Sequence, residues 1–195
     1  MDRARIIKAA ILMIIMVVLC GGYYYYLSSR NSKNNSEKNA QDQATEMTAV
    51  QELIARDSYR EYPTTPVQVL KYYNEITACF YNESYSEDEL SKMATMIRNL
   101  FDAELVANQS FENYLSSLKD DIAVFKGGNI TIYNCEVTPS TDVEYFEHDG
   151  YSCAKLNCVY TLKSGTVYQT TKEVFIMRKD PDGHWKIFGF TLAEE

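Results

Sequence analysis

Histidine and the short motifs of familiar catalytic sites are what this 195-residue sequence has least of. Only two histidines are present, His148 in an acidic stretch and His184 just after a turn signal. The sequence has no nucleophile elbow, phosphate-binding loop, zinc-ligand spacing or calcium-loop pattern. Neighbouring acids such as Asp120 and Asp121 diverge by about 100° on a helix, which is typical of a solvated face. The sequence therefore identifies no catalytic residue, no metal ligand and no cofactor.

Positive charge is also in deficit. The chain has 19 Lys and Arg against 27 Asp and Glu, a formal net charge of −8. From residue 49 onward the imbalance is steeper, with 13 basic residues against 23 acidic ones. Nucleic acids and anionic lipid surfaces repel such a surface. We therefore expect no nucleic-acid partner.

Cysteine occurs at five positions, none with the spacing of a metal site. Cys20 lies in an apolar run near the start, and the other four lie in the region that follows: Cys79, Cys135, Cys153 and Cys158. Cys153 and Cys158 are five residues apart, so in one strand they point to opposite faces and cannot pair with each other. A disulfide from Cys135 to one of them and four reduced, buried thiols are both compatible with the sequence.

Long apolar segments are absent except for residues 9–26, which contain no charge. With its apolar neighbours this run reaches the roughly 30 Å of a bilayer core as a helix. Bulky tyrosines at positions 23–26 follow it, which favours a membrane interface over a cleaved signal peptide. We predict a transmembrane anchor at residues 9–27 in the lipid bilayer, after a cytoplasmic N-terminus at residues 1–8. A buried helix of a soluble core is the alternative.

Residues 28–48 are almost entirely polar or charged. Such a segment cannot bury enough apolar surface to offset the entropy of ordering, so we predict a disordered tether. The remaining residues, 49–195, have the usual length of one domain. We place this domain outside the cytoplasm, in a cell membrane crossed once.

The first half of the predicted domain has the pattern of helices. Apolar residues recur at helical spacing in residues 49–58. N-cap signals at Thr65, Ser86 and Ser110 start three more helices. The second helix runs to about residue 81, the third through residue 101 with an extension over residues 105–106, and the fourth to the glycines at 127–128.

The second half has the pattern of strands, with dense β-branched and aromatic residues. Strands are predicted at residues 130–137, 151–162, 166–178 and 184–192, and a short strand at 143–146 stays open. Helices followed by a strand meander predict an α+β fold class. In full, the prediction is an N-terminal transmembrane helix, then helices packed on a curved antiparallel sheet of about four strands.

The ending VFIMRKDPDGHWKIFGF, at residues 174–190, resembles the nuclear-transport-factor-2-like superfamily of cystatin-like α+β cones. In that superfamily a polar hairpin turn commonly leads into a final strand with a Trp-Lys-Ile type sequence. With its apolar run and tether, the chain also resembles uncharacterised membrane-anchored proteins of gut clostridia. The superfamily includes isomerases, cyclases and dehydratases that use Asp, His and Tyr at the wide end of the cone. No catalytic motif comes with the resemblance, and one fold hosts many functions.

The high tyrosine content, sixteen residues, is the unusual feature of this sequence. Aromatic residues with polar tips can line a concave pocket, and the alternative is that they pack the rim of a small sheet. The candidate pocket residues are Tyr73, Phe80, Tyr160 and Trp185. Further tyrosines considered for the same pocket are Tyr72, Tyr145, Tyr151 and Tyr168.

Two functions follow from these observations. The first is a non-enzymatic binding or assembly domain, with an envelope protein or further copies of the chain as partner. The second is a small-ligand sensor or an isomerase- or dehydratase-type enzyme that uses the cone pocket. The second requires an acid or base inside the cone beside tyrosines.

Overall fold

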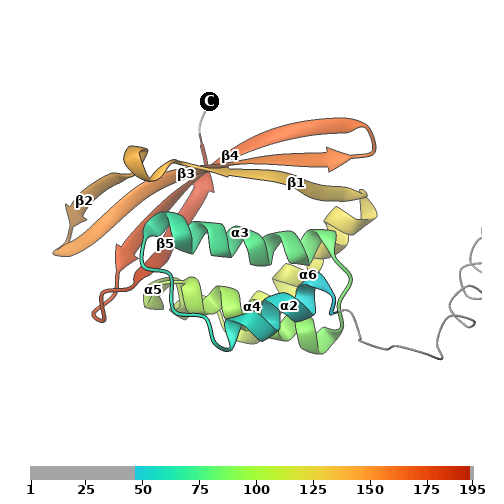
Figure 1. Cartoon of the computed structure of the whole chain (residues 1–195), viewed down its shortest axis with the longest axis horizontal. Helices are drawn as coiled ribbons and strands as arrows, with labels where there is room; N and C mark the ends of the chain where they lie inside the picture. Colours follow the sequence, from blue (N-terminus) through green and yellow to red (C-terminus); the bar gives the residue numbers. More distant parts are fainter. Residues whose placement is uncertain (1–46, 194–195) are drawn as a thin grey trace, which may run out of the picture. The chain divides into compact units, whose positions relative to one another are not determined.

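The computed structural model describes residues 47–193, in which five α-helices precede a five-stranded antiparallel sheet (Figure 1). The helices are α2 (Ala49–Asp57), α3 (Pro66–Asn82), α4 (Glu87–Leu100), α5 (Ala103–Ala107) and α6 (Phe111–Gly127). The strands are β1 (Ile130–Val137), β2 (Glu144–His148), β3 (Tyr151–Ser164), β4 (Val167–Lys179) and β5 (Trp185–Leu192). A single 3₁₀ turn, Ser140–Asp142, precedes β2.

Side-chain caps start the helices where the sequence predicts them. Thr65 accepts a hydrogen bond from the Gln68 amide, with Pro66 in the first turn of α3. Ser86 and Glu89 form a reciprocal capping box at the start of α4, and each cap satisfies a backbone donor that the helix leaves open. Ser110 caps α6 in the same way.

The predicted extension of the third helix over residues 105–106 is wrong. The helix ends at Leu100 because Phe101 takes an extended conformation and forms a parallel bridge with Ile187 of β5. The Asp102 side chain then accepts a hydrogen bond from the Glu104 amide and starts the separate short helix α5.

Strand β3 organises the sheet, whose order is β1-β3-β4-β5 with β2 also on β3. β3 is 14 residues long, enough for two strands to pair along one edge. β1 pairs with its second half, from Val137 opposite Cys158 to Ile130 opposite Ser164. β2 pairs with its first half, from Lys155 to Tyr151.

The predicted fold class therefore needs correction. The fold is α+β, but the sheet has five strands rather than about four, because the connection at residues 138–150 supplies β2 along the free half of β3. No helix within residues 47–193 is long and apolar enough to cross a membrane. The transmembrane helix predicted at residues 9–27 and most of the tether predicted at 28–48 lie outside the described residues.

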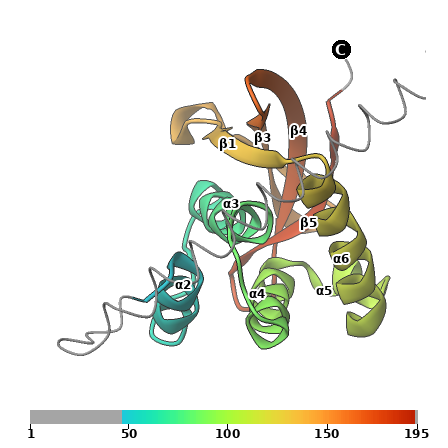
Figure 2. The same cartoon turned by 90° about the vertical axis from the view of Figure 1, so that its right-hand side faces the viewer.

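The core lies between the helices and one face of the sheet, as Figures 1 and 2 show. Alternate residues of each strand point to this face, so β4 buries Phe175 and Met177 completely. The helices contribute fully buried apolar side chains from their own inward stripes, among them Leu70, Ile76 and Met93. The large apolar residues of both layers thus form one continuous core.

A buried ion pair holds the corner between α4 and α5 against the sheet. Asp102 is 3% exposed, and its amide donates to the Ile187 carbonyl at 2.8 Å. Arg178 of β4 contacts both carboxylate oxygens of Asp102, at 2.6 and 3.0 Å. The exposed Glu104 accepts a further hydrogen bond from Arg178.

The four cysteines of the domain are free thiols. Cys135 lies opposite Tyr160, seven residues along β3 from Cys153 and more than 20 Å from it at about 3.3 Å per residue. A bond between Cys135 and Cys153 is therefore impossible in this fold.

Candidate functional site

A cavity of about 520 Å³ lies between the helices and the inner face of the sheet. One wall comes from α3 and the facing wall from α6, on opposite sides of β5 in Figure 2. Strands β1, β3, β4 and β5 supply the floor, and Arg98, Phe101 and Leu105 lie at one end. The volume is within the range of small-molecule sites in proteins.

Seven of the nineteen residues that line this cavity are aromatic. Tyr81 packs against Phe125 with ring centroids 4.1 Å apart, which joins α3 to α6. Near the other end, Phe101 meets Tyr114 edge to face, with centroids 6.2 Å apart. Tyr73 lies near Phe101 and Phe190, with centroids 6.3 and 6.2 Å away. The lining also includes small polar side chains, namely Thr77, Ser117 and Thr171, together with apolar ones such as Leu105, Leu118 and Ile132.

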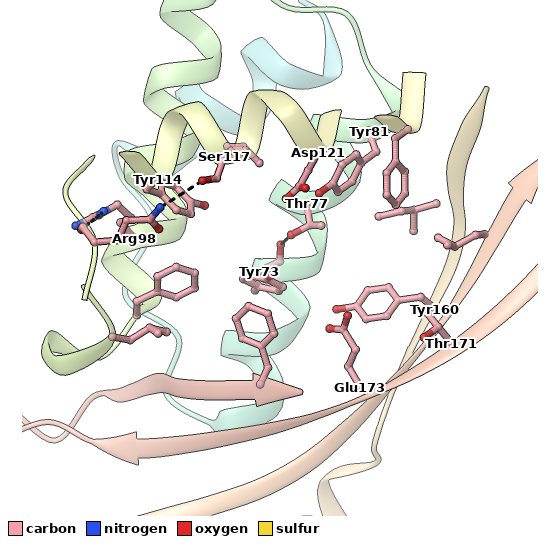
Figure 3. Close-up of a pocket in the computed structure, with 18 of the residues that line it drawn as sticks. Tyr73, Thr77, Tyr81, Arg98, Tyr114, Ser117, Asp121, Tyr160, Thr171 and Glu173 are labelled. Carbon is pink, nitrogen blue, oxygen red and sulfur yellow. Dashed lines mark hydrogen bonds between the residues drawn. The ribbon is translucent and has the colours of Figure 1, made fainter. Parts of the chain in front are cut away.

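Glu173 is the acid on the floor of the cavity. It belongs to the same alternating set as the buried Phe175 and Met177, so β4 directs it to the helix side of the sheet. In Figure 3 its carboxyl group lies beside Tyr160 and points toward α3. Among the described residues no side chain forms a hydrogen bond or ion pair with this carboxyl group. Burial raises the pKa of Glu173 above its usual value of 4.5, because no partner stabilises the charged form.

A buried hydrogen-bond chain fixes Tyr160 next to Glu173. The Tyr160 hydroxyl donates to Asn74 Oδ1 at 2.7 Å, and Asn74 Nδ2 donates to Cys158 Sγ at 3.2 Å. Asn74 is 5% exposed and belongs to α3, whereas the other two residues belong to β3. The chain therefore ties the helix layer to the sheet at the cavity and holds the Tyr160 ring in one orientation.

The other tyrosines of the cavity keep their hydroxyl protons. Burial raises the pKa of Tyr81 to about 12 and that of Tyr73 further. Burial also raises the pKa of Tyr114. Within the described part of the chain, the hydroxyl groups of Tyr81 and Tyr114 have no hydrogen-bond partner, although both residues line the cavity. They remain available as neutral donors and acceptors for a ligand.

Arg98 is the cation that lines the cavity, and its guanidinium group is already occupied. It donates to the carbonyl oxygens of Gln109 and Val106 at 3.0 and 3.1 Å. It also lies over the rings of Phe111 and Tyr114, 5.8 and 5.6 Å from their centroids. Arg98 therefore holds the turn between α5 and α6 instead of pairing with Glu173.

The four residues predicted for a pocket lie in three places. Tyr73 and Tyr160 line the cavity. Phe80 is 1% exposed and packs in the core. Trp185 lines a separate depression at the β2 end of the sheet, beside Tyr145 and Lys179. A role in ligand binding stays a prediction for each of them.

The remaining sequence candidates lie outside the cavity. Tyr72 donates its hydroxyl to Asp57, and its ring packs under Arg60. Tyr145, Tyr151 and Tyr168 are 57%, 42% and 51% exposed. Both histidines are exposed, and His184 packs on the ring of Tyr62.

One cluster of metal-ligand types occurs within the described residues, in the turn between β4 and β5. Ligand atoms of Asp180, Asp182 and His184 lie within 4.8 Å of one another. Asp180 Oδ1 accepts hydrogen bonds from the amides of Asp182 and His184. The requirements of the turn therefore account for this grouping, and we assign no metal to it.

Sequence reasoning missed Glu173, and a signal for it existed. An acidic residue in phase with two buried apolar residues of the same strand marks a charge on the inner face of a sheet. The α6 wall was missed as well, because the divergence of α3 and α6 depends on tertiary packing. The sequence leaves open whether Cys135 and Cys158 form a disulfide. Both residues lie next to this site, and both are free thiols.

Sequence comparison matches residues 1–190 to a family described as "Domain of unknown function (DUF6715)". Comparison with curated proteins gave no match.

Proposed function

The chain belongs to this family, and we propose that its domain is a receptor for a small organic molecule held in the cavity between helices and sheet. The observation that carries the proposal is the unpaired Glu173 carboxyl group in a cavity of about 520 Å³ lined in part by aromatic rings. A partly desolvated, unpartnered carboxyl group lowers the stability of a fold, and a ligand that contacts it compensates for that cost.

The shape and chemistry of the cavity also support a receptor function. Apolar walls with a few convergent polar groups are the usual composition of small-molecule sites. Here the polar groups are Glu173 and the hydroxyl groups of Tyr73, Tyr81 and Tyr114. The order of helices and strands around the cavity also supports the proposed relationship to the nuclear-transport-factor-2-like superfamily.

Proton transfer in the same cavity is a second candidate, and Glu173 favours it. A carboxyl group with a raised pKa suits a general acid or base of the isomerase or dehydratase type. A receptor function has fewer structural requirements than an enzyme, because proton transfer also needs a substrate hydrogen within about 3 Å of the carboxyl oxygen. Exchange of ligand protons with deuterated solvent, dependent on Glu173, would favour the enzyme.

The assembly function predicted from the sequence concerns other surfaces. Tyr133 and Tyr168 are exposed and pack edge to face, with ring centroids 5.1 Å apart. Exposed aromatic pairs suit a protein contact. Location outside the cytoplasm and an envelope protein partner stay predictions of the sequence.

The receptor proposal is tested with an uncharged fluorescent probe, N-phenyl-1-naphthylamine, titrated into the full chain. We expect saturable binding of one probe per chain with a rise in fluorescence. Thr171 lines the cavity opposite Tyr160 in the β3–β4 pairing. A Thr171→Trp variant fills the space and is expected to weaken binding by roughly tenfold or more, since one tenfold step corresponds to about 1.4 kcal/mol.

A matched control is one residue away. Thr170 is exposed and its side chain leaves the opposite face of β4, so Thr170→Trp adds the same ring outside the cavity. This variant is expected to bind the probe like the unmodified chain. Equal binding by both tryptophan variants, with circular dichroism unchanged, would place the probe elsewhere and count against the proposal.

A further inference from the structure

The charges around the cavity are unbalanced. Its lining contains two acids, Glu173 on the floor and Asp121 on α6, and one base, Arg98. Arg98 already satisfies two carbonyl oxygens and two ring faces. Glu173 is therefore a half-buried acid that lacks a counter-ion among the described residues, whereas the side chain of Asp121 is exposed to solvent.

The aromatic rings around Glu173 also favour a cation. The faces of Tyr and Phe rings carry partial negative charge and attract cations, most strongly where water is excluded. Seven aromatic residues line the cavity and come from α3, α6, β3, β5 and the turn after α4: Tyr73, Tyr81, Phe101, Tyr114, Phe125, Tyr160 and Phe190. Figure 3 shows Tyr73 and Tyr160 on either side of the space in front of Glu173. A carboxylate within an aromatic cage is complementary to an ammonium group and repels an anion.

We propose that the ligand is a small organic cation, with its ammonium group at Glu173, Tyr73 and Tyr160 and its apolar body between α3 and α6. The inference rests on the receptor function proposed above and adds the chemical class of the ligand. The ammonium group supplies the missing counter-ion of Glu173. The apolar body contacts Phe101, Leu105 and Phe125.

Three probes of similar shape and different charge test the inference with the full chain. They are the cation 3-phenylpropyltrimethylammonium, the neutral 4-phenylbutan-1-ol and the anion 4-phenylbutanoate, each in competition with N-phenyl-1-naphthylamine. The cation is expected to displace the fluorophore at a concentration roughly tenfold below that of the alcohol, since Coulomb attraction to Glu173 and cation–π contacts add to the apolar ones. The anion is expected to be the weakest.

Glu173→Gln keeps the shape of the side chain and removes its charge. This variant is expected to bind the cation no better than the alcohol, with affinity for the alcohol unchanged. Asp120→Asn is the matched control, because Asp120 is an exposed acid of α6 that does not line the cavity and is screened by water. Its preference for the cation is expected to change by less than about threefold, as suits a screened surface charge.

The outcomes separate the two proposals. If the fluorophore binds and the cation is no tighter than the alcohol, or if Glu173→Gln keeps the preference, the cation inference is overturned while the receptor proposal stands. If neither the fluorophore nor any of the three probes binds, both are overturned. A cation preference that disappears only in Glu173→Gln supports the inference.

Discussion

Glu173 determines which ligands the cavity can bind, because no positively charged side chain of the described residues lies beside its carboxyl group. Its strand neighbours across the sheet are Cys158 and Leu192, neither of which offers a positive charge. A carboxylate partly removed from water without a partner lowers stability, and this half-burial raises the pKa of Glu173. Natural proteins keep such residues mainly where a ligand or a reaction uses them.

Replacing Glu173 by Gln should therefore stabilise the ligand-free protein at neutral pH. A raised pKa means that the folded state binds the proton more tightly than the unfolded chain does. The stability from this group is fully present below the unfolded value near 4.5 and is lost as pH rises through the folded value. We expect Glu173→Gln to raise the free energy of unfolding at pH 8 by at most about 1 kcal/mol, because solvent reaches part of the carboxyl group and screens its charge. At pH 4 the two proteins should be nearly equal.

Urea unfolding at the two pH values measures this difference. The other titrating groups near the cavity, including Cys158 and Asp121, are the same in both proteins, so their contributions cancel in the comparison. Glu112→Gln, an exposed residue in the first turn of α6, serves as the control with little expected effect. A Glu173→Gln variant that is less stable at pH 8 would mean that the carboxylate has a stabilising contact.

At the level of elements, the corner between α4 and α5 depends on Asp102. This carboxylate caps α5 and pairs with Arg178, and both groups are largely buried, with side chains 5% and 13% exposed. Asp102→Ala leaves the Arg178 charge with only the exposed Glu104 as a partner. We expect a loss of about 3 kcal/mol in the free energy of unfolding, as for other broken buried pairs. Because Phe101, Leu105 and Val106 line the cavity, probe affinity should fall as well.

Glu104 provides the comparison for this corner. It contacts the same guanidinium group at 2.9 Å, but its side chain is 65% exposed. Glu104→Ala is expected to cost less than about 1 kcal/mol, because solvent screens a surface ion pair. Similar losses in the two variants, measured by urea unfolding, would contradict the distinction between the buried and the exposed contact.

The elements themselves were largely predictable, because their signals are local. N-caps at Thr65, Ser86 and Ser110 set three helix starts, and side-chain alternation set the strands. Local signals could not reveal that β3 pairs with β2 as well as β1, since register along a long strand depends on the partners. The cavity was predictable only through Tyr73 and Tyr160. Its other wall comes from α6, whose distance from α3 is a tertiary property.

At the scale of the whole molecule, the core joins the two layers that enclose the cavity. Residues from α2, α3, α4, α6 and all five strands or their flanking residues contribute to one apolar cluster. Asn74 adds a polar tie between α3 and β3 in the middle of it. Domains of this size with a single core commonly unfold in one cooperative step. We therefore expect the helix layer and the sheet to lose protection together.

The buried thiols can report on both layers at once. Cys79 of α3 is 9% exposed and Cys158 of β3 is fully buried. Hydrogen bonds from Cys135 and Asn74 lower the pKa of the Cys158 thiol, whereas burial raises that of Cys79 to about 11. In a full chain carrying Cys20→Ser, we expect labelling by a thiol reagent, followed by peptide mass spectrometry, to be slow at both sites. The two rates should rise in parallel with urea, because both thiols become reactive only on global unfolding.

Unequal labelling rates at Cys79 and Cys158 would show that the two layers open separately. If Cys158 were modified quickly while Cys79 stayed protected, the sheet would open at the cavity without unfolding of α3, and cooperative unfolding would be contradicted. Asn74→Leu sharpens the comparison, because it removes the hydrogen bonds to Cys158 and Tyr160 but keeps an apolar side chain of similar size. This variant is expected to raise both labelling rates by a common factor of roughly five to thirty, the effect of losing 1 to 2 kcal/mol of global stability. An increase in the labelling rate at Cys158 alone would show that Asn74 stabilises only the sheet side of the cavity.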